Sequence, residues 1–78
     1  QKLVNIKVTD KKIAMEDKEI LEECEKVEKE LEGNGRILLR ASGTENLIRV
    51  MVEASSDELT DKYCEQVAKI VREKYEVK

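Results

Sequence analysis

The sequence contains no histidine, which removes the side chain most often used as a general base and as a metal ligand. Its only aromatic residues are two tyrosines, and neither lies in a strand-like run where nucleic-acid bases could stack on it. No apolar run approaches the roughly 20 residues that span a bilayer, and no signal-peptide pattern opens the chain. These absences predict a soluble protein with neither a nucleic-acid nor a membrane partner.

Cysteine is also scarce. Cys24 and Cys64 lie far apart, and neither has the close second cysteine that zinc sites use. Both fall at the core spacing of predicted helices, so we interpret them as small buried hydrophobic residues rather than as a disulfide or a nucleophile. This cysteine usage predicts no metal site and favours a reducing, cytoplasmic compartment.

Length and charge limit the function further. A chain of 78 residues is long enough for one domain, residues 1–78, and too short for a large enclosed active site. The 15 basic and 18 acidic residues give a formal charge of -3 and alternate along the chain. A general nucleic-acid binder would show a basic excess instead.

Hydrophobic periodicity predicts five elements in the order β-α-β-β-α. Asp17 is a plausible cap for the first helix, the Gly-Asn-Gly run at 33–35 ends it, and Ser56 or Asp57 caps the second helix. The run 9–17 is expected to be a connection. The strands are predicted over 3–8, 36–40 and 47–54, and the helices over about 18–31 and 55–75.

Each helix has one apolar stripe, and each strand has one apolar face. This predicts an α+β fold, a two-layer sandwich in which both helices pack on one face of a mainly antiparallel sheet. A right-handed crossover joins the first two strands, and the third strand forms a hairpin with the second. We expect the third strand to lie in the middle, giving the order 1-3-2.

Two arginines flank the loop of this hairpin, in the run LLRASGTENLIR at 38–49. Arg40 and Arg49 both have the strand parity opposite to the core, so both should leave the sheet on its helix-free face. If the hairpin closes around 41–46, Arg40 faces Leu47 and Leu38 faces Arg49. The arginines are then diagonal neighbours, with backbones roughly 7–8 Å apart, and can reach a common anion.

The loop between the arginines adds further donors. Ser42 and Thr44 carry hydroxyl groups, and Gly43 permits a turn that directs successive N–H groups into one concavity. With the planar arginines, this set predicts a phosphate clamp. The alternative is an ordinary hairpin turn between solvated arginines, and Glu45 favours it because a carboxylate repels an anion unless it turns away.

The run GRILLRASGTENLIRVMVEA at 35–54 resembles the C-terminal domain of the α-D-phosphohexomutases, most closely the glucosamine-phosphate branch. The order of elements also fits, so the resemblance covers nearly the whole chain and implies a fold like that of the TATA-box-binding protein. Asn46 stands where the family commonly has proline, which leaves the path of the loop open. The family motif R-x-S-G-T-E-P-x-x-R is matched by Arg40, Ser42, Gly43, Thr44, Glu45 and Arg49.

This resemblance implies that the chain is the C-terminal phosphate-binding domain of a larger cytoplasmic isomerase. It has no serine-histidine-asparagine stretch for the phosphorylated nucleophile and no aspartate-rich run for magnesium. We therefore expect no catalytic residue, cofactor or metal in this domain, magnesium in the parent enzyme, and a phosphosugar and the other domains as partners. The residues implied to contact the substrate phosphate are Arg40, Ser42, Gly43, Thr44 and Arg49.

Three other functions stay open. The chain could come from a phosphomannomutase or phosphoglucomutase, because a phosphate clamp does not distinguish the sugar ring. It could be a stand-alone anion-binding or interaction module that docks a partner on Leu3, Leu38, Leu47 and Met51 of the helix-free face. A ferredoxin-like nucleic-acid or regulatory domain shares the element order but is disfavoured by the few aromatic residues and the acidic balance.

Overall fold

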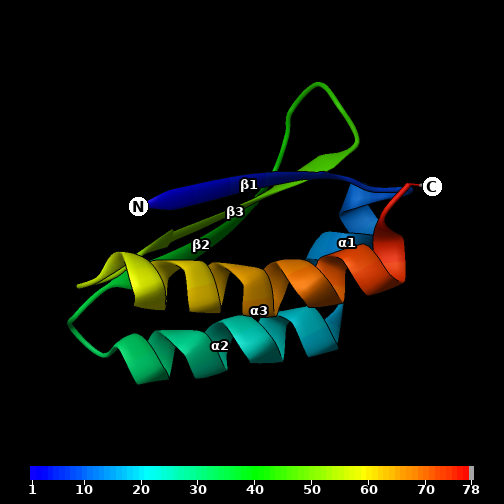
Figure 1. Cartoon of the computed structure of the whole chain (residues 1–78). Coiled ribbons are helices and arrows are strands. Elements are labelled where there is room, and N and C mark those ends of the chain that lie inside the picture. The colour runs from blue at the N-terminus through cyan, green and yellow to red at the C-terminus, as the bar shows by residue number, and fades with distance from the viewer. Residues whose placement is uncertain (78) are drawn as a thin grey trace.

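The structure is a computed structural model that describes residues 1–77, so the last residue of the predicted domain lies outside the described part. The sheet forms one layer and the two long helices form the other (Figure 1). Five of the elements occur in the predicted order, and each of their ends lies within two residues of the predicted one. The elements are β1 (Lys2–Lys7), α1 (Lys11–Glu16), α2 (Lys18–Leu31), β2 (Arg36–Ala41), β3 (Leu47–Glu53) and α3 (Asp57–Tyr75).

The sheet has the order β1-β3-β2, and both pairings are antiparallel, as predicted. In the central strand β3, Ile48, Val50 and Val52 are buried, because β-branched side chains on alternate positions share the face that the helices cover. The helix-free face carries the other residues of the strand. The side on which each β3 side chain leaves the sheet therefore follows from its parity alone.

The prediction for residues 9–17 was wrong, because α1 forms there. The Asp10 carboxylate accepts hydrogen bonds from the backbone N–H groups of Lys12 at 3.0 Å and Ile13 at 3.1 Å, which caps the first turn. Ala14 is the residue that α1 buries. Six residues with one buried side chain give no helical periodicity, so hydrophobic spacing could not reveal this helix.

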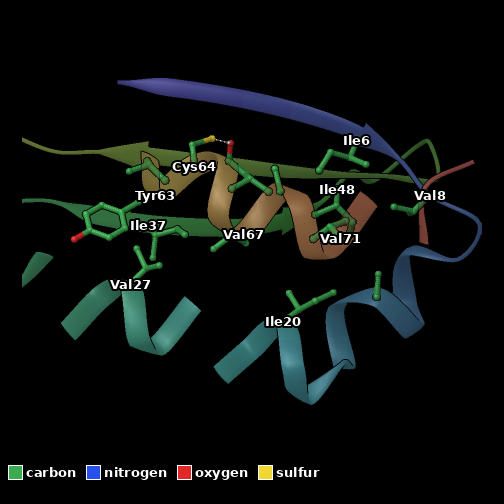
Figure 2. Close-up of a cluster of buried hydrophobic side chains, with 14 of the residues drawn as sticks. Ile6, Val8, Ile20, Val27, Ile37, Ile48, Tyr63, Cys64, Val67 and Val71 are labelled. Carbon is green, nitrogen blue, oxygen red and sulfur yellow. Dashed lines mark hydrogen bonds between the residues drawn. The ribbon is translucent and has the colours of Figure 1, made fainter. Parts of the chain in front are cut away.

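The core lies between the sheet and helices α2 and α3 (Figure 2). The Ser56 side chain accepts from the N–H of Leu59 at 3.2 Å, so Ser56 is the cap of α3. Several residues predicted for the core, including Cys24 and Ile70, are half-buried at its margin. The fully or nearly fully enclosed hydrophobic residues are Ile6, Val8, Ala14, Ile20, Val27, Leu31, Ile37, Ile48, Val50, Val52, Tyr63, Cys64, Val67, Ala68 and Val71.

The connection from α2 to β2 depends on two glycines for different reasons. Gly33 has a φ of +83°, a left-handed conformation that side chains other than hydrogen disfavour. Gly35 lies against the end of β3. A methyl group there would overlap the backbone oxygen of Glu53 and lie 2.9 Å from the Cα of Ala54. The sequence indicated the first role, and only the folded chain reveals the second.

The end of α3 is tied to the junction between α1 and α2. Asp17 caps α2 through the N–H of Ile20 and accepts hydrogen bonds from the Tyr75 hydroxyl and from Lys74 Nζ, the latter at 3.0 Å. The hydrogen bond from Tyr75, followed by those from Lys74 and Ile20, lowers the pKa of Asp17 from 3.8 to about 2. The folded state therefore favours the ionised carboxylate.

We predict that replacing Gly35 by alanine lowers the free energy of unfolding by about 1–3 kcal/mol, because the added methyl group overlaps the backbone of β3. Urea denaturation followed by circular dichroism measures the change. Gly43→Ala is the matched control, because a methyl group there meets no atom within 4 Å and its φ is not left-handed. Equal stability of the two variants would contradict this account of Gly35.

The Asp17 contacts predict a specific pH dependence. Since its pKa is lower in the folded state, its carboxylate stabilises the fold above the ordinary pKa of 3.8, and this contribution is lost as the pH falls toward about 2. The difference in free energy of unfolding between wild type and Asp17→Asn should therefore shrink across that window. Urea denaturation at a series of pH values measures it, with Glu19→Gln as a control that also faces Lys74. A difference independent of pH would refute the prediction.

Candidate functional site

Two arginines stand directly opposite each other on neighbouring strands. In the pairing of β2 with β3, Arg40 is the partner of Arg49, and both side chains are exposed on the helix-free face. The expected register, with Arg40 opposite Leu47 and Leu38 opposite Arg49, was wrong by two residues, since Leu38 pairs with Met51. A shift of two positions preserves strand parity, so both arginines keep their predicted face.

The hairpin loop is shorter than expected, because the pairing of β2 with β3 continues two residues beyond Arg40. The N–H of Ser42 donates to the carbonyl oxygen of Leu47 at 2.9 Å, which leaves residues 43–46 as the loop. In Figure 1 this loop extends beyond the sheet on the side away from α2 and α3. The arginine pair therefore lies near the loop, on the same exposed side of the sheet.

The electrostatic surroundings of the four arginines differ. Arg36 lies 3.9 Å from a carboxylate oxygen of Glu53, and Arg72 lies 3.2 Å from one of Glu65. Within the described residues, Arg40 and Arg49 form no such ion pair. Like charges directly opposite each other destabilise a sheet. An anion bound between the two guanidinium groups would attract both of them and so offset their mutual repulsion.

The arginines also border a small groove. It has a volume of about 250 Å³ and is open to the helix-free face of the sheet. Apolar side chains from all three strands form the rest of its wall. The lining residues are Leu3, Leu38, Arg40, Arg49 and Met51.

Inside the loop, the backbone N–H groups converge on a side chain. The Ser42 hydroxyl oxygen accepts from the N–H groups of Thr44 and Glu45, both at 3.3 Å. Ser42 and Thr44 are half-buried and exposed, respectively. The predicted concavity of successive N–H groups is thus filled by Ser42 Oγ, whose own hydrogen stays available for donation.

Gly43 has a different role from the one expected. Its φ is not left-handed, so the turn itself does not require glycine, and the space where a side chain would begin is open to 4 Å. Neither backbone conformation nor packing within the chain explains a residue without a side chain here. Close approach of a ligand to the backbone is a reason that agrees with both observations.

Contacts from the N-terminal segment hold the loop in place, and sequence reasoning missed them. Lys11 Nζ donates to the backbone oxygen of Ser42 at 2.6 Å and to that of Glu45 at 3.2 Å. The N–H of Val8 donates to the backbone oxygen of Asn46 at 2.9 Å. These residues lie more than 30 positions before the loop, so no local pattern could reveal them.

The two cysteines are free and do not resemble nucleophiles. Burial raises the pKa of the Cys24 thiol to about 11 and also raises that of Cys64. The Cys64 thiol faces the backbone oxygen of Val50 at 3.9 Å (Figure 2). Their placement in and beside the core agrees with the interpretation as hydrophobic residues.

The described part of the chain, residues 1–77, contains neither a cluster of metal ligands nor a helix suited to cross a membrane. No three side chains among its cysteines, aspartates and glutamates gather in a way that could hold a metal ion. Likewise, none of its helices combines the length and apolar character needed to cross a membrane. Among the described residues, the arginine pair with its loop is the arrangement best suited to binding an anion.

Comparison with known families and proteins gives consistent matches. Residues 3–70 match the family described as "Phosphoglucomutase/phosphomannomutase, C-terminal domain". Phosphoglucosamine mutase of Anoxybacillus flavithermus is 53% identical over 75 residues, which are 96% of this chain and 17% of that protein. The same enzyme of Lactobacillus johnsonii is 58% identical over 73 residues, 94% of this chain and 16% of that protein. The chain therefore spans about a sixth of these relatives.

Solved structures agree with the sequence matches. A crystal structure of N-acetylglucosamine-phosphate mutase, an α-D-phosphohexomutase in its substrate complex, superposes with a TM-score of 0.76 and 30% identity, over 90% of this chain and 15% of that one. Aspergillus fumigatus N-acetylphosphoglucosamine mutase, in complex with GlcNAc-6P and magnesium, also gives 0.76, with 28% identity over 92% and 15% of the chains. The resemblance thus extends to the fold.

Proposed function

Because this chain belongs to the family of phosphoglucomutase/phosphomannomutase C-terminal domains, we propose that it holds the substrate phosphate within a phosphoglucosamine mutase. The observation that carries the proposal is the pair Arg40 and Arg49, opposed across two strands without carboxylate partners in the described chain. A phosphate group carries the charge and the several acceptor oxygens that two guanidinium groups can share. The identity of 50% or more to phosphoglucosamine mutases supports the choice of enzyme.

The proposed phosphate contacts are of three kinds: charged donors, neutral donors and an open approach to the backbone. Arg40 and Arg49 supply planar N–H donors, and the hydroxyl groups of Ser42 and Thr44 supply neutral donors from the loop. Gly43 lets the phosphate approach the backbone, since no side chain occupies that space. The arginines should dominate the affinity, because each carries a positive charge and can donate two hydrogen bonds to the phosphate, whereas each hydroxyl group donates one from a neutral side chain.

In this proposal the domain positions the substrate and carries out no chemical step. The parent enzyme would interconvert glucosamine 6-phosphate and glucosamine 1-phosphate through a bisphosphorylated sugar, with a phosphoserine in another domain as donor and acceptor. While one end of the sugar reacts, residues 40–49 would hold the phosphate at the other end. Positioning of this kind is a large part of phosphoryl-transfer catalysis.

Magnesium would be bound elsewhere in the parent enzyme. The related structure from Aspergillus fumigatus contains magnesium together with GlcNAc-6P. The described residues of this chain offer no group of three ligands for it, so the ion would neutralise phosphoryl charge in another domain. The two free thiols support the predicted cytoplasmic location.

The helix-free face of the sheet would contact the other domains. Leu3 is 55% exposed and Leu38 is 38% exposed, and Leu47 and Met51 lie half-buried on the same face. An apolar group of this kind is unfavourable in water unless another surface covers it. A neighbouring domain at this face would also place the substrate between itself and the arginine pair.

Titration of the ¹⁵N-labelled chain with inorganic phosphate tests the site. We expect saturable amide shifts concentrated in residues 40–49, and about tenfold weaker binding for Arg40→Ala and for Arg49→Ala, because each loses charged hydrogen bonds. Two-dimensional NMR spectra at increasing phosphate concentration give both the sites and the dissociation constants.

Arg36→Ala is the matched control for this titration. Arg36 lies on β2 with the same strand parity as Arg40, but it pairs with Glu53. Its loss should leave phosphate binding within about twofold of wild type, since it is not placed at the loop. Equal weakening by all three substitutions would indicate a general charge effect and contradict the proposed site.

The choice of enzyme requires the full-length protein. We expect it to convert glucosamine 6-phosphate with a kcat/KM at least about tenfold above that for glucose 6-phosphate or mannose 6-phosphate, as specific sugar recognition implies. Coupled assays of the three substrates under the same conditions measure the ratios. A preference for glucose or mannose phosphate would assign the chain to another branch of the family.

A further inference from the structure

Lys11 connects the N-terminal segment to the loop between β2 and β3. It lies at the start of α1, and its ammonium group donates to the backbone oxygens of Ser42 at 2.6 Å and Glu45 at 3.2 Å. Ser42 directly precedes the loop at 43–46, and Glu45 lies near the other end of that loop. One side chain thus contacts the loop region at two points, and the oxygen of Glu45 also accepts from the N–H of Leu47 at 2.9 Å.

The direction of these hydrogen bonds affects the N–H groups of the loop. In a planar trans peptide the C=O of one residue and the N–H of the next point in opposite directions. Drawing the oxygens of Ser42 and Glu45 toward Lys11 therefore directs the N–H groups of Gly43 and Asn46 away from it. Within the described residues, neither of these two N–H groups donates to a protein acceptor.

The helix α1, which carries Lys11, is itself held in place by several contacts. Asp10 caps α1, and Ala14 is buried, so the short helix is anchored at its start and in its middle. Next to it, the N–H of Val8 donates to the backbone oxygen of Asn46 at 2.9 Å. The side chain of Lys11 is partly buried, which limits its freedom. These contacts give the ammonium group a defined position relative to the loop.

We propose that Lys11 is a positioning residue for the phosphate-binding loop, holding its backbone so that unpaired N–H groups face the substrate phosphate. The inference rests on the proposed function, because Lys11 would support the loop that the proposed function assigns to phosphate binding. Lys11 itself acts through the two carbonyl groups and does not touch the phosphate. A loop ordered before binding loses less conformational freedom when the ligand arrives, which strengthens binding.

The test uses the ¹⁵N-labelled chain and two readouts. Without ligand, the ¹H–¹⁵N heteronuclear NOE of the amides at 43–46 reports the order of the loop. With inorganic phosphate, the titration reports affinity. For Lys11→Met, which keeps the aliphatic stem, we expect lower NOE values in the loop and a dissociation constant about tenfold higher.

Lys12→Met is the matched control. Lys12 is the exposed neighbour of Lys11 on the same helix, and its substitution removes the same charge. It should leave loop order unchanged and affinity within about twofold of wild type. Lys11→Arg, which keeps a cationic donor, should restore most of the binding. Urea denaturation of each variant separates a local effect on the loop from a loss of global stability.

The outcomes separate the inference from the proposed function. Unchanged loop order in Lys11→Met overturns the positioning role, even if its affinity falls, because Lys11 would then act by charge alone. Equal weakening by Lys12→Met also overturns it. Absence of saturable binding in wild type would instead refute the phosphate site, while the NOE comparison still decides whether Lys11 orders the loop.

Discussion

The rest of the structure depends on the antiparallel pairing of β3 with both of its neighbours. This central strand buries Ile48, Val50 and Val52 against the helices, so its remaining side chains must leave on the other face. Arg49 is one of them, and the pairing with β2 brings Arg40 opposite to it. The hydrophobic core thus fixes the orientation of the charged site, although no core residue belongs to the site.

Repulsion between Arg40 and Arg49 destabilises the sheet locally, and the rest of the fold compensates for it. Two opposed cations weaken the hairpin. The other two arginines of the chain, Arg36 and Arg72, each have a carboxylate partner instead. The strands remain paired because β3 has a neighbour on each side and because backbone hydrogen bonds close the hairpin. Stability gained in the sheet and core therefore offsets the repulsion between the two arginines, which the proposed binding of an anion would relieve.

The proposed phosphate site is built from segments that are distant in the sequence. The strands supply the arginines, the loop supplies hydroxyl and N–H donors, and the N-terminal segment fastens the loop through Lys11 and Val8. A second set of long-range contacts, from Asp17 to Lys74 and Tyr75, fixes the end of α3 beside this segment. Both sets meet at α1, since Lys11 at its start contacts the loop and Asp17 at its end contacts α3.

The sequence by itself determined the sheet faces and the helix stripes, because alternation and helical spacing report which side of an element is buried. The expected strand order came from the hairpin and the crossover, and the structure confirms it. The sequence could not determine the register, since a shift of two residues leaves every parity unchanged and places Arg40 opposite Arg49 in place of Leu47. Likewise, α1, the close approach at Gly35 and the contacts of Lys11 appear only in the tertiary structure. These features depend on atoms brought together across many residues, and local periodicity carries no information about such distances.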